Sequence, residues 1–293
     1  MDGIILVDKP SGITSAEVVR RIKAKVKPAR VGHLGTLDPF ATGVLPIMVG
    51  EGTKLAPMLE GGDKVYEGVI KLGAETDTLD RDGKVVREAP VPVTEPARLA
   101  EVARQFTGKI DQVPPVFSAI KRDGVRMYKL ARKGNPEDLE PPPIRNVEIK
   151  ALSLEVIGPE EIRFVATCSP GTYARALARD IGVALGTVAH LHELRRTRSG
   201  HFAIEKAVSL DDALTIEPRH LIGLRDALPD LAELEVDDKT EKLLRNGDSR
   251  ALEGQVPAGT EMFKVIFQGQ LIAVAQATSR VTATIVRGFS VTN

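Results

Sequence analysis

The first thirty residues contain a short apolar run, then a break, and then an amphipathic stretch. GIILV is a short apolar run, and the proline and glycine of the following DKPSG interrupt it, so the pattern predicts a strand and then a turn. Thr14 and Glu17 have the spacing of a capping box, and an apolar residue then returns every fourth position, at Val18, Ile22 and Val26. We therefore expect a helix that begins after Thr14 and packs on the core through this stripe.

Further along the chain, strand and helix patterns are mixed without a regular β-α-β alternation. A Gly- and Pro-rich stretch leads into the apolar run GVLPIMVG, and PPPIRN at 141–146 is typical of an extended connector. Period-2 or apolar runs predict strands at 65–73 and 147–168, and helical periodicity follows Thr94 and spans 175–186. This mixture favours an α+β domain on a largely antiparallel central sheet.

The pattern changes near residue 232. LPDLAELEVDD resembles a domain boundary, and three short strands separated by turns follow it: MFKVIF, QLIAVAQA and VTATIVRGFSV. We expect a large domain at 1–232 and a small β-rich domain at 233–293, because 293 residues exceed the size at which one core usually stops growing.

Composition narrows the class of protein. With 42% hydrophobic and 27% charged residues, the chain is typical of a soluble globular protein, and no stretch approaches the roughly 20 apolar residues of a membrane span. The N-terminus lacks a signal-peptide layout, and the lone cysteine, Cys168, suits a reducing compartment. One cysteine and five histidines show no zinc-ligand spacing. We therefore expect a cytoplasmic protein without a metal site or a membrane segment.

The formal net charge is zero, but the charges are segregated along the chain. Basic residues gather at 20–30, at 120–134 and at 194–202, where Arg195, Arg196 and Arg198 lie. Compensating acids lie elsewhere, at Glu75, Asp77, Asp80, Asp82 and from 226 to 238. Such segregation is consistent with a basic face that binds phosphates, or simply with solvated helix faces.

The densest candidate chemistry lies in GHLGTLDPFATGVLP, which contains Asp38. Its glycines permit close backbone approach, and Pro39 restricts Asp38 to extended backbone, so the carboxylate would be held rigidly. From this pattern alone, Asp38 is either a turn residue or a presented acid. The chain has no phosphate loop, dinucleotide fingerprint, nucleophile elbow or HExxH, which leaves chemistry that a side chain performs without a cofactor.

Five spaced motifs resemble those of the TruB family of tRNA pseudouridine synthases, in the family's order and over most of residues 1–230. They are DKPSGITS, GHLGTLDPFATGVLPIMVGEGTKL, VYEGVIKLGAETDTLDRDG, CSPGTYARALARDIG and AHLHELRRTRSGHF. The last sixty residues resemble a PUA domain more weakly. The resemblance implies the pseudouridine synthase fold and isomerisation of a uridine by base detachment, rotation and rejoining through C5, a reaction without net redox change.

The resemblance also implies roles for particular residues. Asp38 would be the nucleophile or base; attack at C6, attack at C1′ and removal of the C2′ proton all stay open. Arg175 would pair with Asp38, and Tyr66 would stack on the uracil and remove the C5 proton late in the reaction. A sheet-packing tyrosine and a surface helix arginine are the plainer alternatives. No second carboxylate of motif character accompanies Asp38.

Four further residues are expected at the substrate by the same resemblance. His33 would enter the RNA loop once the target nucleotide is flipped out, and Tyr173 and Leu194 would line the uracil pocket. Lys9 is grouped with them, although together with Pro10 it is expected to buttress the loop rather than to react.

The sequence thus predicts a stand-alone tRNA pseudouridine synthase. We expect a monomer that acts on uridine 55 in the T-arm without cofactor or guide RNA. Two alternatives remain: a guide-RNA-dependent synthase of rRNA, and a non-catalytic tRNA-binding or folding chaperone that retains the fold.

Overall fold

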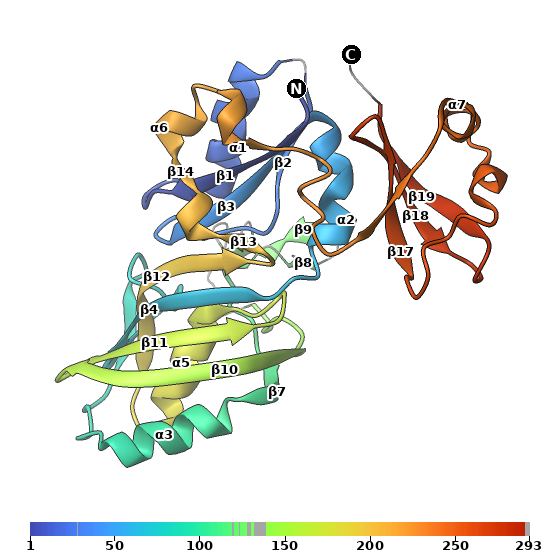
Figure 1. The fold of residues 1–293 in the computed structure, drawn as a ribbon. Coiled ribbons are helices and arrows are strands. Elements are labelled where there is room, and N and C mark those ends of the chain that lie inside the picture. The colour runs from blue at the N-terminus through green and yellow to red at the C-terminus, as the bar shows by residue number, and fades with distance from the viewer. Residues whose placement is uncertain (28, 119, 123, 128–129, 132–138, 291–293) are drawn as a thin grey trace.

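The computed structural model describes residues 1–27, 29–118, 120–122, 124–127, 130–131 and 139–290 (Figure 1). Within these residues, eleven strands form one large sheet, whose main path runs in the order β14 (Val208–Ser209), β1 (Gly3–Lys9), β3 (Thr42–Val49), β12 (Ala189–Ser199), β4 (Lys64–Leu72), β11 (Glu161–Cys168), β10 (Arg145–Gly158) and β7 (Gly108–Gln112). Three short strands pair beside this path: β2 (Val31–His33), β13 (Phe202–Ala203) and β15 (Leu221–Ile222).

The large sheet is mostly antiparallel, as the sequence pattern predicts. Its two parallel pairs are β1 with β14 and β3 with β12. The second pair joins the N-terminal strands to the β4–β11–β10 part of the sheet, through Thr42 opposite Arg195 and Gly43 opposite Arg196. Strands distant in sequence therefore meet at the centre of the sheet, and the expected α+β class is confirmed.

Helices cover the sheet at several points. α1 (Ser15–Lys25) contacts β2, α3 (Pro96–Gln105) contacts β10, α5 (Ala174–Ala184) contacts β12, and α6 (Leu210–Ala213) contacts β1. The expected cap of α1 is confirmed, because the Thr14 hydroxyl accepts a hydrogen bond from the Glu17 amide at 3.0 Å. The buried positions of α1 include Val18 and Ile22 of the predicted stripe.

Shorter elements connect these parts. They are η1 (Gly50–Leu55), α2 (Ala56–Leu59), β5 (Ala74–Thr76), β6 (Val85–Glu88), β8 (Lys121–Arg122), β9 (Val125–Arg126), η3 (Ile204–Lys206) and η4 (Pro218–His220). None of the described helices is both long and apolar enough to cross a membrane.

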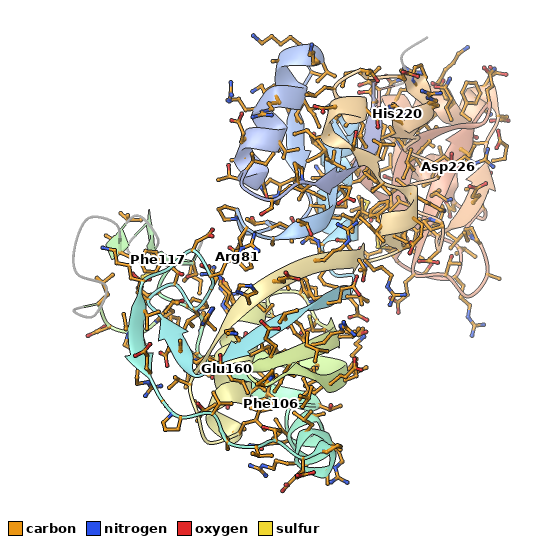
Figure 2. The ribbon with its side chains drawn as sticks, turned by 90° about the vertical axis from the view of Figure 1, so that its left-hand side faces the viewer. Arg81, Phe106, Phe117, Glu160, His220 and Asp226 are labelled. Carbon is orange, nitrogen blue, oxygen red and sulfur yellow. The ribbon has the colours of Figure 1, made fainter. Side chains whose placement is uncertain are left out.

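The C-terminal residues form a separate four-stranded sheet, in the order β16 (Ala232–Glu235), β17 (Met262–Phe267), β18 (Gln270–Ala277) and β19 (Ala283–Gly288). The three strands predicted here are confirmed, whereas β16 lies in the stretch that the pattern predicts only as a boundary. The helix α7 (Asp238–Arg245) and η5 (Ser249–Leu252) follow in a stretch for which the pattern predicts no element. The segment that carries His220 and Asp226 leads from the large sheet toward this domain (Figures 1 and 2).

The small domain shares a hydrophobic core with the large one. Ile266, Leu271 and Phe289 pack in one cluster with Ile4 of β1 and Met48 of β3. The alternate residues of β1, including Ile5 and Val7, belong to the main core of the large domain. Strand β1 is therefore buried on both faces, which explains why GIILV is a continuous apolar run rather than an alternating one.

Gly43 offers a test of the central strand junction. Its φ is +106°, and a Cβ there would come within 2.2 Å of the Arg196 backbone oxygen. Gly108 is a matched control, since its φ is +104° and a Cβ would meet nothing within 4 Å. We expect Gly108→Ala to cost about 1–2 kcal/mol through backbone strain alone. Gly43→Ala should cost several kcal/mol more, seen as a larger drop in thermal unfolding midpoint; equal drops would contradict the close approach.

Candidate active site

Hydrogen bonds from the N-terminal segment fix the backbone of the loop that carries Asp38. The Ser15 hydroxyl donates to the Leu37 carbonyl at 3.0 Å and accepts from the Leu37 amide at 2.9 Å. The Gly12 amide and the Ser11 hydroxyl donate to the carbonyls of Pro39 and Phe40, at 2.8 and 2.9 Å. The first two sequence motifs are thus one structural unit, in which KPSGITS fixes the backbone on both sides of Asp38.

Asp38 and Arg175 form a two-point ion pair. Nε of Arg175 donates to Oδ2 of Asp38 at 2.9 Å, and Nη2 donates to Oδ1 at 3.0 Å. The Arg175 side chain is 5% exposed and that of Asp38 is 32% exposed. The guanidinium therefore holds the carboxylate from the protein side and leaves its other side open to a substrate, as a nucleophile or base requires. The expected pairing of these two residues is present in the structure.

The remaining donors of Arg175 are also engaged. Nη1 donates to the Thr78 carbonyl at 2.8 Å, and Nη2 donates to the Phe117 carbonyl at 3.0 Å. Nη1 lies 3.4 Å from Oδ2 of Asp80. Because all three nitrogens of the guanidinium donate hydrogen bonds, its orientation is fixed, and so is the orientation of the Asp38 carboxylate that it holds. In Figure 2, the labels of Phe117 and Arg81 stand next to each other at the same height of the molecule.

Asp80, which the sequence pattern places in a cluster of acids that compensates the basic segments, is a buried carboxylate. It is 6% exposed, and burial raises its pKa, with the Asp38 charge adding to the rise. The Thr78 hydroxyl, at 2.6 Å, and the Arg175 charge act in the opposite direction. The backbone beside it is constrained, because Leu79 has a φ of 61° and its carbonyl accepts from the Leu191 amide of β12.

Tyr66 and Tyr173 approach the same carboxylate from two elements. Tyr66 lies near the start of β4, and Tyr173 caps α5, where its backbone exchanges two hydrogen bonds with the Gln112 side chain. Burial raises the pKa of both phenols, and the Asp38 charge raises each further. Both phenols therefore lie within electrostatic range of Asp38.

The other expected pocket residues have different environments. Leu194 is buried on β12, in the hydrophobic cluster against which Tyr66 packs. His33 ends β2 and is half-buried, next to Leu34, whose amide donates to the Pro46 carbonyl. The roles of these residues toward RNA stay predictions.

Lys9 holds the loop rather than facing a substrate. Its side chain is fully buried, and Nζ donates to the carbonyls of Pro10, Ile13 and Pro39 at 2.8, 2.8 and 3.1 Å. The placement fits the expected buttress, and it does not support the grouping of Lys9 with the substrate-binding residues.

The three basic segments differ in the exposure and the pairing of their charged side chains. The cations of α1, such as Lys23 and Lys25, are exposed, although Arg20 and Arg21 pair with Glu17. In the segment 120–134, the side chains of the basic residues lie outside the described part of the structure. In the third segment Arg195 pairs with Asp8 at 2.7 Å, and Arg196 is 1% exposed, so the expectation that Arg196 contributes to a basic face is wrong.

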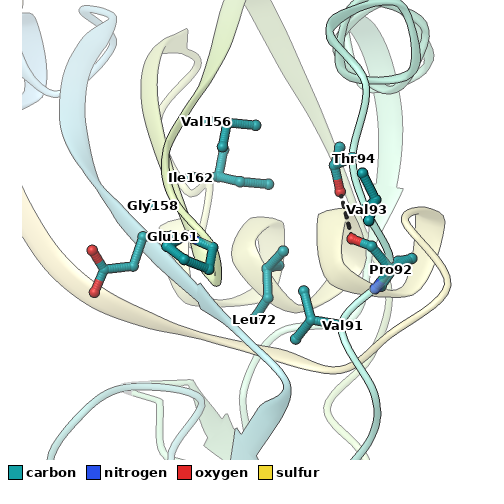
Figure 3. A pocket seen from close by; sticks show the side chains of 10 residues that line it. Leu72, Val91, Pro92, Val93, Thr94, Val156, Gly158, Glu161 and Ile162 are labelled. Carbon is teal, nitrogen blue, oxygen red and sulfur yellow. Dashed lines mark hydrogen bonds between the residues drawn. The ribbon is translucent and has the colours of Figure 1, made fainter.

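A surface hollow of about 360 Å³ lies away from Asp38 (Figure 3). Leu72, Val91 and Ile162 line it, together with neighbouring residues of β10 and β11. Because Tyr66 is near the start of β4 and Leu72 at its end, the hollow is about 20 Å from Tyr66. It is not part of the site around Asp38.

Two family models match this chain. One, described as TruB family pseudouridylate synthase (N terminal domain), covers residues 21–174, and the other, described as tRNA pseudouridylate synthase B C-terminal domain, covers residues 175–219. The site and fold define a pseudouridine synthase, an isomerase. The chain belongs to the TruB family of these enzymes, which confirms the resemblance carried by the five motifs.

Relatives and solved structures agree with this assignment. The chain is 42% identical over 289 residues to the tRNA pseudouridine synthase B of Geobacter sulfurreducens, covering 94% of each chain. It is 43% identical over 288 residues to that of Geotalea uraniireducens, covering 94% of this chain and 92% of the relative. A solved Cbf5-Nop10-Gar1 complex contains a chain that matches with a TM-score of 0.71 at 25% identity, over 98% of this chain and 85% of the other, which confirms the expected fold.

The buried ammonium of Lys9 gives a pH-dependent prediction. Burial lowers the pKa of Lys9 from 10.5 to about 8, with the Asp38 charge opposing and the Arg196 charge adding to the change. Below pH 8 the lysine is charged in both the folded and the unfolded chain, and the cost of burying the charge is fully present. Between about pH 8 and 10.5 the unfolded chain binds more protons, so stability should rise with pH.

The comparison variant is Lys9→Met, which removes this titration. We expect the wild-type protein to gain stability relative to Lys9→Met as pH rises from 7.5 toward 10, by an amount on the order of 3 kcal/mol at full effect. The measurement is the difference between their thermal unfolding midpoints at each pH. A constant difference across this range would mean that Lys9 titrates normally in the fold.

Proposed function

We propose that this protein converts the uridine at position 55 of the tRNA T-loop to pseudouridine, with Asp38 as the catalytic carboxylate. The observation that carries the proposal is the asymmetric ion pair, in which a buried Arg175 presents a partly exposed Asp38. Two phenol rings accompany this carboxylate, and such rings provide faces for stacking on a flipped base.

The proposed reaction divides the work among these residues. Asp38 acts on the flipped nucleotide as nucleophile or base, and Arg175 keeps its carboxylate in place. Tyr66 stacks on the uracil and removes the C5 proton after the base has rejoined the sugar, while Tyr173 and Leu194 complete the pocket. His33 occupies the space that the flipped base leaves in the RNA loop. No step in this scheme needs a cofactor.

Transfer RNA is the proposed substrate because of the relatives. Proteins named tRNA pseudouridine synthase B match this chain at 42–43% identity over nearly their full length. The chain of the solved complex matches at 25% identity, and that complex contains Cbf5 together with Nop10 and Gar1. The closer agreement in sequence and length favours the stand-alone activity, without a guide RNA.

Contacts to the RNA backbone are proposed for two places. The exposed lysines of α1 would meet phosphates, so binding should weaken as salt concentration rises. The domain at 233–293 is proposed as a PUA-like RNA-binding module, attached to a catalytic domain at 1–232. We further propose that the enzyme acts as a cytoplasmic monomer.

The deciding experiment uses purified protein and an unmodified tRNA transcript, without guide RNA or cofactor. We expect pseudouridine at position 55 and none in a transcript with cytidine there, by chemical mapping of the modified base. Modification at another position would refute the site assignment. Absence of product, or product only with a guide RNA, would refute the stand-alone activity and leave the guide-dependent and chaperone alternatives.

Asp38→Asn tests the catalytic assignment. The amide keeps the size of the carboxylate but removes its charge and one acceptor for Arg175, so turnover should fall by at least about 10³-fold while tRNA affinity is retained. The control is Glu155→Gln, an exposed carboxylate paired with Arg163, which should keep full turnover. Single-turnover rates and filter binding are the measurements; substantial residual turnover in Asp38→Asn would count against the assignment.

A further inference from the structure

Arg196 is the largest side chain that the structure buries fully among its described residues. Its Nε donates to the Val44 carbonyl of β3 at 2.9 Å, and its Nη2 donates to the Gly35 carbonyl at 3.1 Å. Among the described residues, no ion pair joins it to a carboxylate, and both of these acceptors are backbone carbonyls. A buried charge without a counter-ion is costly, so its presence needs an explanation.

The register of the sheet places this charge beside Tyr66. Arg196 of β12 is directly opposite Tyr66 of β4 in their antiparallel pairing, so the two side chains point to the same face of the sheet. The guanidinium lowers the pKa of the Tyr66 phenol, both by its charge and by a side-chain hydrogen bond, against the larger effect of burial, which raises it. Cys168 of β11 and Asp38 of the loop also face the phenol, and both raise the pKa.

Two further buried cations lie within electrostatic range of Arg196. Lys9 is fully buried and Lys64 is 7% exposed, and the Arg196 charge contributes to lowering the pKa of each. Lys64 donates to the Gly62 carbonyl at 2.6 Å. The protein thus gathers three buried cations in this region, and Arg196 is the one that lies directly opposite Tyr66 in the sheet.

We propose that Arg196 is a positioning residue for Tyr66: it fixes the phenol against the catalytic loop and stabilises the phenolate that removes the C5 proton. This inference rests on the proposed function. In the step concerned, the phenol has already lost its proton to solvent. The phenolate takes the proton from C5, the C5–H electron pair becomes the C5=C6 double bond, the N1=C6 pair moves onto N1, and N1 takes a proton from water.

The first test needs no tRNA. The chain has three tyrosines and no tryptophan, so protein labelled with 3-fluorotyrosine gives three fluorine resonances, and Tyr66→Phe identifies that of Tyr66. In Arg196→Met the Tyr66 resonance should titrate about one pH unit higher than in the parent. The Tyr173 resonance is an internal control, because that phenol faces Arg145 and Arg175 instead. Arg195→Met, which removes the neighbouring charge paired with Asp8, should leave the Tyr66 titration unchanged.

Two more variants keep the test decisive if Arg196→Met fails to fold. Arg196→Gln is also neutral but retains a donor for one backbone carbonyl, and it should show the same shift. Arg196→Lys restores a charge, so its Tyr66 titration should return toward that of the parent. An unchanged Tyr66 titration in a folded neutral variant would overturn the proposal.

The second test separates this role from general support of the fold. With tRNA that carries deuterium at uridine C5, the neutral variants should show a single-turnover rate lowered about 10²-fold and a deuterium isotope effect larger than in the parent, because C5 proton removal has become slow. A slowed reaction without an increased isotope effect would refute the proposal. If the parent itself makes no pseudouridine, the proposed function fails, whereas the fluorine titration still decides whether Arg196 stabilises the Tyr66 phenolate.

Discussion

The two-point hydrogen bond between Arg175 and Asp38 is the interaction on which the rest of the site depends. Its partners are 137 positions apart in the chain, so the pair forms only when the whole sheet is assembled. The loop around Asp38 is fixed by hydrogen bonds from the segment 9–15, and Arg175 is the second residue of α5, whose N-cap residue Tyr173 is hydrogen-bonded through its backbone to Gln112 of β7. A rigid carboxylate therefore requires three distant segments to be in register, and none of them alone determines its direction.

The central strand junction makes that register possible. Gly43 and Arg196 face each other across the parallel β3–β12 pair, where only a residue without a Cβ permits the approach. The interior at this point is polar, since Lys9, Lys64 and Arg196 direct their charges at backbone carbonyls. Carbonyls of an irregular loop need donors when they are buried, and long cationic side chains supply them. These hydrogen bonds offset part of the cost of burying the charges, and those from Lys9 and Arg196 hold the backbone of the Asp38 loop in place.

The sequence predicts the local features well and the direction of charged side chains poorly. The Thr14 cap, the stripe of α1 and the strands β1, β4 and β17 follow from periodicity and capping chemistry, which act over a few residues. Asp80 and Arg196, in contrast, occur in runs of charge that resemble solvated surface. Register shifts in β12 between Leu191 and Glu193, and again between Arg196 and Arg198, change which face successive residues point to. No count of charges along the chain reveals such a shift, because it is set by pairing with β3 and β4.

The small domain is linked to the site around Asp38 through strands that pack against the cores of both domains. In β3, Leu45 and Ile47 belong to the main core, whereas Val44 and Met48 belong to the cluster shared with the C-terminal sheet. The backbone carbonyl of Val44 is also the acceptor for Arg196. A strand packed on both faces has little freedom to shift. The C-terminal sheet therefore holds β3 and its Val44 carbonyl in place, and this carbonyl in turn helps to position Arg196 beside Tyr66. The small domain therefore has a structural part in the site that is separate from any contact it makes with RNA.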